Sequence, residues 1–319
     1  MEIAKGIHHL KFQLRTDAVG SFNLLSGDRT GLVDSGTHPQ VGATLRPYCS
    51  GINLDAKSIS TIVNTHWHGD HMGGNAEIKE LSGAIVMAHL LDVEFIENPV
   101  SSVQAFVARY GKYHPMYGRT LEEMSQGQPR GSKVDRVLEE GDVVEVGPYK
   151  LEVIHTAGHT PGSITLYNRD LRTAFAGDAL QGQGQSNGLA YYIDLEPYLI
   201  TLEKIARLDL DSLIVAHEYM PLKETVLKGP KIKQFLSICK ETVDRYDNQI
   251  LEAVHGAGGP LTAGQVTKGV LEKNNVSQMA VSSVACVLTH LERLTSQGEL
   301  RRLPPGPDGD SAEDTWAKA

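Results

Sequence analysis

Short apolar runs bounded by turn residues dominate the first two thirds of the chain. Runs of this length and setting are typical of strands. They predict strands at Lys11–Leu14, Phe22–Leu25, Thr30–Val33, Ile59–Asn64, Ala84–Ala88, Val143–Val146, Lys150–His155, Ser163–Tyr167, Thr173–Ala176 and Ser212–Ala216. Helical patterns lie between them, at Asn75–Leu81, at Leu90–Glu97 and after Pro197. Strands interleaved with helices predict an α/β fold built of stacked layers.

Beyond about Thr225 the apolar residues recur every three to four positions, which is the period of a helix. The pattern predicts a helix over 232–254, a second that opens at a capping box formed by Thr262 and Gln265, a third over 281–291, and a short strand over 299–303. We therefore expect three parts: an α/β domain over 1–225, a helical unit over 226–303 and a disordered acidic tail over 304–319.

Residues 99–133 interrupt the α/β pattern with large side chains among glycines and prolines. These side chains are Phe106, Tyr110, Tyr113, Met116, Tyr117 and Met124. Two interpretations stay open. The segment is an insertion that packs its aromatic residues locally, or it is a lid or entrance wall over a functional site.

The composition describes a globular, acidic protein. Hydrophobic residues make up 40% and charged residues 22% of the 319 positions, and 30 Lys and Arg stand against 39 Asp and Glu, a formal net charge of −9. This charge disfavours a nucleic-acid binder. Cys49, Cys239 and Cys286 lie too far apart in sequence for a thiolate zinc motif or a disulfide framework. No signal peptide or membrane span is visible, so we expect a cytoplasmic protein without a membrane partner.

The segment Thr65–His71 carries the candidate chemistry. His66, His68, Asp70 and His71 follow a predicted buried strand within a glycine-rich turn. Several buried imidazoles are hard to explain by packing, because each needs its own polar partner. Imidazole and carboxylate groups together suit zinc, iron or manganese. Further candidate ligands stand at the ends of later predicted strands: His159, Asp178 and His217.

The other histidines are expected to be ordinary core or surface residues. They are His8, His9, His38, His89, His114, His155, His255 and His290. His155 lies close to His159 in sequence, but the alternation of side chains along a strand is expected to point it elsewhere.

Across residues 1–225 the chain resembles the metallo-β-lactamase superfamily. The resemblance rests on the His-x-His-x-Asp-His core at 66–71, the Gly-His-Thr-Pro-Gly turn at 158–162, the Gly-Asp pair at 177–178, His217 after a strand, and the early Asp34. It implies an αβ/βα four-layer sandwich as the catalytic domain, with a binuclear metal site at one edge. The bridging position of Asp178 is closer to glyoxalase-II-like thioesterases and lactonases than to true β-lactamases.

The resemblance also implies roles for individual residues. His66, His68 and His159 would hold one metal ion, Asp70, His71 and His217 a second, and Asp178 would bridge both. Asp34 would orient the loops of the site from outside the ligand set. The ions are expected to be two divalent metals, zinc first, with iron or manganese open. Tyr191 and Tyr192 fall where related lactonases place a substrate-facing tyrosine, and packing is the equally open interpretation.

The helical unit resembles the small winged-helix-like appendage of some superfamily members. A winged helix normally reads nucleic acid with a basic helix, but Ser277–Gln297 offers only His290 and Arg293. We therefore expect this unit to serve packing and homodimerisation, and we expect no nucleic-acid partner.

These residues predict a hydrolase. Two cations that share a water lower its pKa toward neutrality, and the resulting hydroxide attacks a carbonyl carbon. Asp70 and His217 are the candidate catalytic residues, with Asp70 orienting the nucleophile. We expect cleavage of a carboxylic ester, thioester or lactone of a small molecule. The alternatives are a phosphodiesterase or RNA nuclease on the same site, a one-iron persulfide dioxygenase, and a non-catalytic effector that binds metal.

Overall fold

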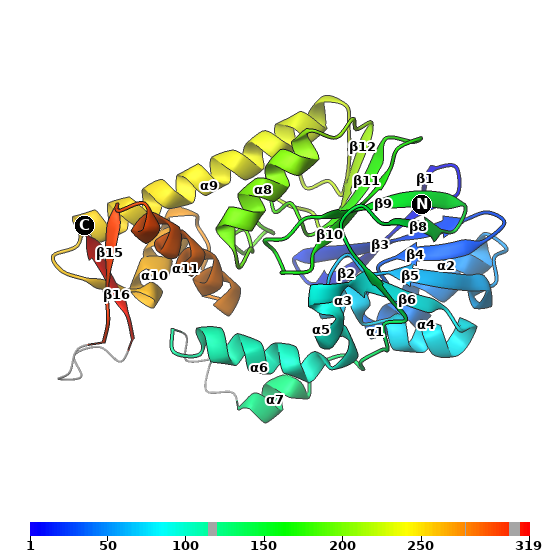
Figure 1. Cartoon of the computed structure of the whole chain (residues 1–319), viewed down its shortest axis with the longest axis horizontal. Helices are drawn as coiled ribbons and strands as arrows, with labels where there is room; N and C mark the ends of the chain where they lie inside the picture. The colour runs from blue at the N-terminus through cyan, green and yellow to red at the C-terminus, as the bar shows by residue number, and fades with distance from the viewer. Residues whose placement is uncertain (114–119, 278, 306–312) are drawn as a thin grey trace.

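The structure is a computed structural model that describes residues 1–113, 120–277, 279–305 and 313–319. Two sheets lie face to face in one part of the molecule, and a helical unit that carries the C-terminus lies at the other end (Figure 1). The first sheet has the strand order β1-β2-β3-β4-β5-β6-β7. Its strands are β1 (Glu2–Ala4), β2 (Ile7–Arg15), β3 (Ala18–Ser26), β4 (Thr30–Val33), β5 (Ile59–Val63), β6 (Ile85–His89) and β7 (Arg136–Leu138).

The second sheet has the order β13-β12-β11-β10-β9-β8. Its strands are β8 (Val143–Val146), β9 (Tyr149–His155), β10 (Ile164–Asn168), β11 (Thr173–Gly177), β12 (Ser212–Val215) and β13 (Val226–Lys228). β4 to β7 run parallel to one another in the first sheet, and β11 and β12 run parallel in the second. The predicted strands are thus confirmed, with shifts of a few residues at their ends.

Apolar side chains from both sheets form the central layer of the sandwich. Val33, Val63, Val153, Leu166 and Ile214 belong to one buried cluster between the sheets. Because strand side chains alternate between two faces, the other face of each sheet needs a cover of its own. Helices supply it on both sides, which gives the expected αβ/βα four-layer sandwich.

The helices before residue 98 cover the first sheet or connect its strands. They are α1 (His38–Gln40), η1 (Val41–Leu45), α2 (Arg46–Gly51), η2 (Ala56–Ser58), α3 (Gly69–Met72), α4 (Asn75–Ser82), η3 (Leu90–Asp92) and α5 (Val93–Glu97). Val41, Leu45 and Ile78 from these helices pack on Leu32 and Ile62 of the sheet.

The segment 99–133 forms α6 (Pro99–Tyr110) and α7 (Leu121–Ser125) within its described residues. Tyr110 is buried against the cluster beneath the second sheet, and Phe106 packs on the same cluster. Residues 114–119, among them His114, Met116 and Tyr117, lie outside the described residues.

The C-terminal part combines three helices with a small sheet of order β14-β16-β15. Its elements are α9 (Pro230–Gly256), β14 (Leu261–Thr262), α10 (Ala263–Lys273), α11 (Val281–Ser296), β15 (Leu300–Leu303) and β16 (Thr315–Lys318). The capping box of Thr262 and Gln265 is confirmed. The expectation of a disordered tail is wrong for β16, because Trp316 is buried there and pairs with Leu261 and Arg302.

One hydrophobic cluster crosses the predicted boundary near Thr225. It joins Val215 of the second sheet and Leu202 of α8 (Leu195–Ala206) to Val243 of α9 and Val287 of α11. The C-terminal helices therefore bury their apolar faces against each other and against the sandwich. The expected homodimer stays a prediction. Of the helices in the described ranges, none has the length and apolar content needed to cross a membrane.

Candidate metal centre

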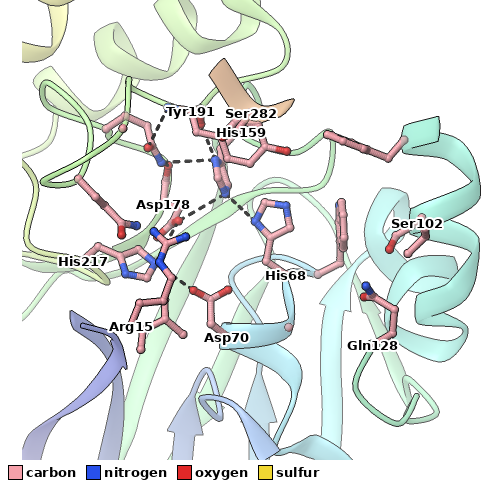
Figure 2. Close-up of a pocket in the computed structure, with 18 of the residues that line it drawn as sticks. Arg15, His68, Asp70, Ser102, Gln128, His159, Asp178, Tyr191, His217 and Ser282 are labelled. Carbon is pink, nitrogen blue, oxygen red and sulfur yellow. Dashed lines mark hydrogen bonds and ion pairs between the residues drawn. The ribbon is translucent and has the colours of Figure 1, made fainter. Parts of the chain in front are cut away.

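Four strand ends deliver the seven candidate ligands to one edge of the sandwich. His66, His68, Asp70 and His71 follow β5, and His159 stands in the turn between β9 and β10. Asp178 follows β11 and His217 follows β12. His68, Asp70, His159, Asp178 and His217 point toward a common centre (Figure 2). The structure thus brings together all seven residues singled out in the sequence.

Three imidazoles form the first half of this cluster. Nε2 of His66 lies 3.0 Å from Nδ1 of His68, and Nε2 of His159 lies 3.2 Å and 2.9 Å from those two nitrogens. Nitrogens around a tetrahedral zinc are separated by about 3.3 Å, given zinc–nitrogen bonds of about 2.0–2.1 Å. The spacing of these three nitrogens therefore fits one tetrahedral cation.

Asp70, His71 and His217 form the second half. Oδ2 of Asp70 lies 3.3 Å from Nε2 of His217 and 3.9 Å from Nε2 of His71. Asp178 lies between the halves, because its Oδ2 is 3.4 Å from Nε2 of both His159 and His217, and its Oδ1 is 3.5 Å from Nε2 of His71. One carboxylate therefore faces both groups.

Hydrogen bonds on the far side of four rings fix which nitrogen faces the centre. Nδ1 of His71 donates to Asp34 Oδ2 at 2.9 Å, Nδ1 of His159 to the Tyr191 carbonyl at 2.6 Å, and Nδ1 of His217 to the Val19 carbonyl at 2.9 Å. Nδ1 of His66 lies 3.1 Å from the Thr65 hydroxyl, which itself donates to Asp34. A ring protonated at Nδ1 presents the Nε2 lone pair, which is how metal-binding histidines are oriented.

Asp34 is not in the ligand cluster, and its hydrogen bonds hold His71 and Thr65 in place. Besides His71, its carboxylate accepts bonds from the Thr65 backbone N–H and the Thr65 hydroxyl, both at 2.8 Å. Its own backbone is left-handed, with φ of 61°. A non-glycine residue in this region is strained. These contacts are those expected of a residue that orients the loops of the site.

Two buried polar atoms face the centre without a hydrogen-bond partner among the described residues, Nε2 of His71 and Oδ1 of Asp178. Buried polar groups are otherwise almost always satisfied. Burial holds the pKa of His68 down at about 3. For His71 burial also favours the neutral ring, but the carboxylates of Asp178, Asp34 and Asp70 outweigh it and raise the pKa to about 9. His71 Nε2 and Asp178 Oδ1, which have no hydrogen-bond partner among the described residues, are a nitrogen and an oxygen donor of the kind that bind divalent cations.

Asp92 ties together the two loops that carry the three imidazoles. It is fully buried, and its carboxylate accepts bonds from the Trp67 N–H at 3.1 Å, the Thr160 hydroxyl at 2.9 Å and the Gly162 N–H at 2.8 Å. Burial raises the pKa of Asp92 to about 7, although the three donors oppose this shift. The carboxylate links the backbone beside His66 and His68 to the turn of His159.

A pocket of about 450 Å³ opens over the centre. Besides ligand residues its wall holds Leu14, Arg15, Trp67, Ser102, Val103, Phe106, Met124, Gln128, Gln181, Gln185, Leu189, Tyr191 and Ser282. Five of these residues come from the segment 99–133, which therefore forms part of the pocket wall rather than only packing on itself. Ser282 comes from α11, so the C-terminal part also reaches the pocket (Figure 2).

The structure separates the two candidate tyrosines. The ring of Tyr191 lines the pocket and stacks on His68, with 5.7 Å between centroids and 9° between planes. Tyr192 is fully buried and its hydroxyl lies 2.8 Å from Nε2 of His290. Tyr192 does not line the pocket, so of the two open interpretations the structure shows packing for Tyr192 rather than a place beside the substrate.

The remaining histidines that the structure describes stand outside the cluster. His155 stacks on His89 at 4.2 Å and its Nε2 bonds the Pro161 carbonyl at 2.7 Å, so its ring points away from the centre. Sequence reasoning missed Asp92 and Gln181. The Gln181 amide donates to the Asp178 carbonyl at 2.8 Å and accepts from the Tyr191 N–H at 3.2 Å. Neither residue belongs to a sequence motif, and most of their partners are backbone groups from other segments of the chain.

Comparisons with known proteins agree with this geometry. The family model described as the metallo-beta-lactamase superfamily matches residues 17–217. A hydroxyacylglutathione hydrolase of Erythrobacter litoralis is 29% identical over 163 residues, 51% of this chain and 50% of the relative. A beta-lactamase-like protein 2 homolog of Drosophila melanogaster is 26% identical over 287 residues, 88% of this chain and 83% of the relative.

The chain spans about half the length of the first hydroxyacylglutathione hydrolases that it matches. Among solved structures, a metallo-beta-lactamase family protein from Thermus thermophilus aligns over 100% of both chains with a TM-score of 0.77 and 22% identity. At this identity the likeness establishes the fold, including the arrangement of the C-terminal part.

Proposed function

Because this chain belongs to the metallo-beta-lactamase superfamily, we propose that it is a dinuclear zinc-type hydrolase that cleaves an acyl C–S or C–O bond of a small molecule. The observation that carries the proposal is the convergence of seven imidazole and carboxylate side chains, with orphaned atoms on His71 and Asp178, at the floor of a pocket. A purely structural domain has no need of such a cluster.

In this proposal His66, His68 and His159 hold one ion, Asp70, His71 and His217 hold the other, and Asp178 contacts both. Two divalent ions bound there would lower the pKa of a water between them and polarise the substrate carbonyl. Asp70 is partly exposed toward the pocket, so its carboxylate can accept a proton from the attacking water. Nε2 of His217 lies 3.3 Å from Oδ2 of Asp70, so an ion bound by His217 would also hold the Asp70 carboxylate in place.

Tyr191 is the proposed substrate contact. Its hydroxyl belongs to a side chain that lines the pocket beside His159, with 5.1 Å between the ring centroids. Burial raises the pKa of this phenol above its ordinary value, so it stays protonated and can donate to a substrate oxygen. The apolar side chains of Val103, Phe106 and Leu189 line the same pocket and can contact a hydrocarbon part of the substrate.

A thioester is the bond type that the relatives favour, since several of them are hydroxyacylglutathione hydrolases. The phosphodiesterase alternative lacks support in the C-terminal part. His290 is buried against Asp247, and Arg293 pairs with Asp247 and Glu196, so neither is free to meet phosphates.

The test is a hydrolysis screen with the purified full-length protein. Acyl thioesters, lactones, aryl esters, bis(4-nitrophenyl) phosphate and single-stranded RNA are assayed before and after metal removal and zinc or manganese return. We expect metal-dependent hydrolysis of a thioester or ester, and no cleavage of RNA. Metal-dependent cleavage confined to the phosphodiesters would overturn the proposal.

A further inference from the structure

Arg15 is the one lysine or arginine in the described wall of the pocket. It is the last residue of β2, and its side chain is exposed. Figure 2 shows the guanidinium directed into the pocket, on the side opposite Ser102 and Gln128. No residue that the structure describes forms an ion pair with it, whereas arginines elsewhere, such as Arg29, Arg172 and Arg302, have carboxylate partners.

A break in the strand register turns Arg15 toward the site. The pairing of β2 with β3 shifts between Gln13 and Arg15, so that Gln13 faces Val19 and Arg15 faces Ala18. In a regular strand two neighbouring side chains would lie on opposite faces. Here both Leu14 and Arg15 line the pocket. Irregularities of this kind are common beside active sites, where they re-aim a side chain.

Other hydrogen bonds hold the β2–β3 hairpin beside the pocket and give its one acidic residue, Asp17, a partner other than Arg15. The Gln13 amide donates to the backbone carbonyls of Arg15 and Ala18. The Asn187 amide donates to Asp17 Oδ2 at 2.6 Å, which joins the hairpin to the loop that carries Gln185 and Leu189. Asp17 is therefore engaged with the opposite loop, and the charge of Arg15 remains available to a ligand.

We propose that Arg15 binds an anionic group of the substrate, a carboxylate or a phosphate, while the acyl bond lies over the metal centre. The planar guanidinium donates two parallel hydrogen bonds to either group. The substrate class is an amphipathic acyl thioester or ester, whose hydrocarbon part contacts Leu14, Val103 and Phe106. The inference rests on the proposed function. A local positive charge favours the binding of an anion to a chain whose formal net charge is −9.

The test compares hexanoyl thioesters that share one acyl group. The thiols of these three compounds are 3-mercaptopropionate, 2-mercaptoethyl phosphate and the neutral 3-mercaptopropionamide. A fourth compound differs in its acyl group: it is a monothioester of adipate, which carries the carboxylate on the acyl side. Wild type is expected to favour at least one anionic compound over the amide by about tenfold in kcat/KM, the size of a charge-assisted hydrogen bond at an exposed site. The preferred compound identifies the anion and its position.

Three variants separate binding at Arg15 from general charge effects. Arg15→Gln is expected to bring the ratio of anionic to neutral kcat/KM toward one, and Arg15→Lys to retain part of it. Arg136→Gln, in the exposed strand β7 and outside the pocket, removes the same charge and is expected to leave the ratio at its wild-type value. A ratio near one in wild type, or a ratio that Arg15→Gln leaves unchanged, overturns the inference while the proposed function stands.

Binding gives a readout that does not need turnover. Thioether analogues of the same compounds, which cannot be hydrolysed, are titrated calorimetrically into wild type and Arg15→Gln. An anionic thioether that binds about tenfold more weakly to the variant supports the inference even if no thioester is cleaved, in which case the proposed function alone fails. Equal affinity for both proteins overturns the inference.

Discussion

At the scale of single residues, Asp178 is the side chain on which both halves of the candidate metal centre depend. Its two oxygens lie 3.4–3.5 Å from His71, His159 and His217. We expect Asp178→Ala to reduce bound metal from about two ions per chain to one or fewer, and turnover by about a hundredfold or more. Elemental analysis after dialysis and steady-state kinetics measure the two effects.

The matched control for this change is Asp170→Ala, an exposed aspartate in the turn before β11. It removes the same charge without contact to the centre and should keep wild-type metal content. If Asp178→Ala retains both the metal content and the rate of wild type, the bridging role is wrong.

Asp92 predicts a pH dependence of stability. Its pKa is about 7 in the folded protein and about 3.9 in an unfolded chain. The folded state therefore holds its proton over a range where the unfolded state has lost it. The stability that this group contributes is fully present below about pH 4 and is lost as the pH rises to about 7, by on the order of 4 kcal/mol.

Asp92→Asn removes the titration and keeps one acceptor oxygen. We expect the free energy of unfolding of wild type minus that of the variant to fall between pH 4.5 and 7.5, as measured by urea denaturation with metal removed. A difference that stays constant across this range would mean that Asp92 is ionised throughout, as its three hydrogen-bond donors favour.

The ligand residues could be predicted from sequence because they form short motifs at strand ends. His66, His68, Asp70 and His71 fall within one turn, and their chemistry is visible without a structure. Asp92 and Gln181 could not be found in this way. Most of their partners are backbone groups that only tertiary folding brings together. A hydrogen bond to a backbone group does not depend on which residue type carries that group, so the sequence does not reveal it.

At the scale of elements, the turn between β9 and β10 fixes the position of His159. Gly158 has φ of +131°, and a Cβ there would lie 2.7 Å from Cα and 2.8 Å from N of Tyr198 in α8. Neither backbone atom can move without shifting the helix. We expect Gly158→Ala to lower the free energy of unfolding by about 2 kcal/mol or more and to displace His159.

Thermal unfolding and metal content test this expectation together. Gly42→Ala is the control, because a Cβ at Gly42 meets nothing within 4 Å and its φ is ordinary. That variant should match wild type or be slightly more stable, since alanine is the better helix former. Wild-type behaviour of Gly158→Ala in both measurements contradicts the steric argument.

Strands with a clear apolar run were predicted well, and some very short, partly exposed strands were not. β5, β10 and β12 are buried runs whose composition alone indicates a strand. β7 and β16 are each only a few residues long and partly exposed. β16 depends on pairing with β14 and β15 and on burial of Trp316, which are contacts between residues far apart in sequence.

At the scale of the whole molecule, the fold class followed from sequence but the independence of its parts did not. A change of hydrophobic period near Thr225 predicts a boundary, and the structure shows helices beyond it. The period cannot tell which partner an apolar face will meet. Here the faces of α9 and α11 meet α8 and the second sheet in one continuous cluster. We therefore keep the boundary near residue 225 as a proposal about where the helical part of the chain begins. It does not imply that the two parts fold separately.

This packing predicts the result of removing the C-terminal part. A chain that ends near Thr225 loses the contacts of Phe235, Val243 and Val287 with the cluster, and the hydrogen bonds of Thr289 to the Leu195 N–H and of His290 to Tyr192. The uncovered apolar surface should make the truncated protein aggregate. Light scattering and size-exclusion chromatography measure this, and a truncated chain that stays monodisperse and folded would show that the parts are independent.

The same packing predicts how the full-length protein meets RNA. His290 and Arg293, the two basic groups of the candidate recognition helix, are held by Asp247 and Glu196, so α11 presents no basic face. Fluorescence anisotropy with a labelled single-stranded RNA, repeated at rising salt, should show no binding at micromolar protein. Salt-sensitive binding that disappears with the C-terminal part would contradict this, because such binding requires counterion release from phosphates by free Lys or Arg side chains. It would also favour a phosphodiester as the substrate of the metal centre.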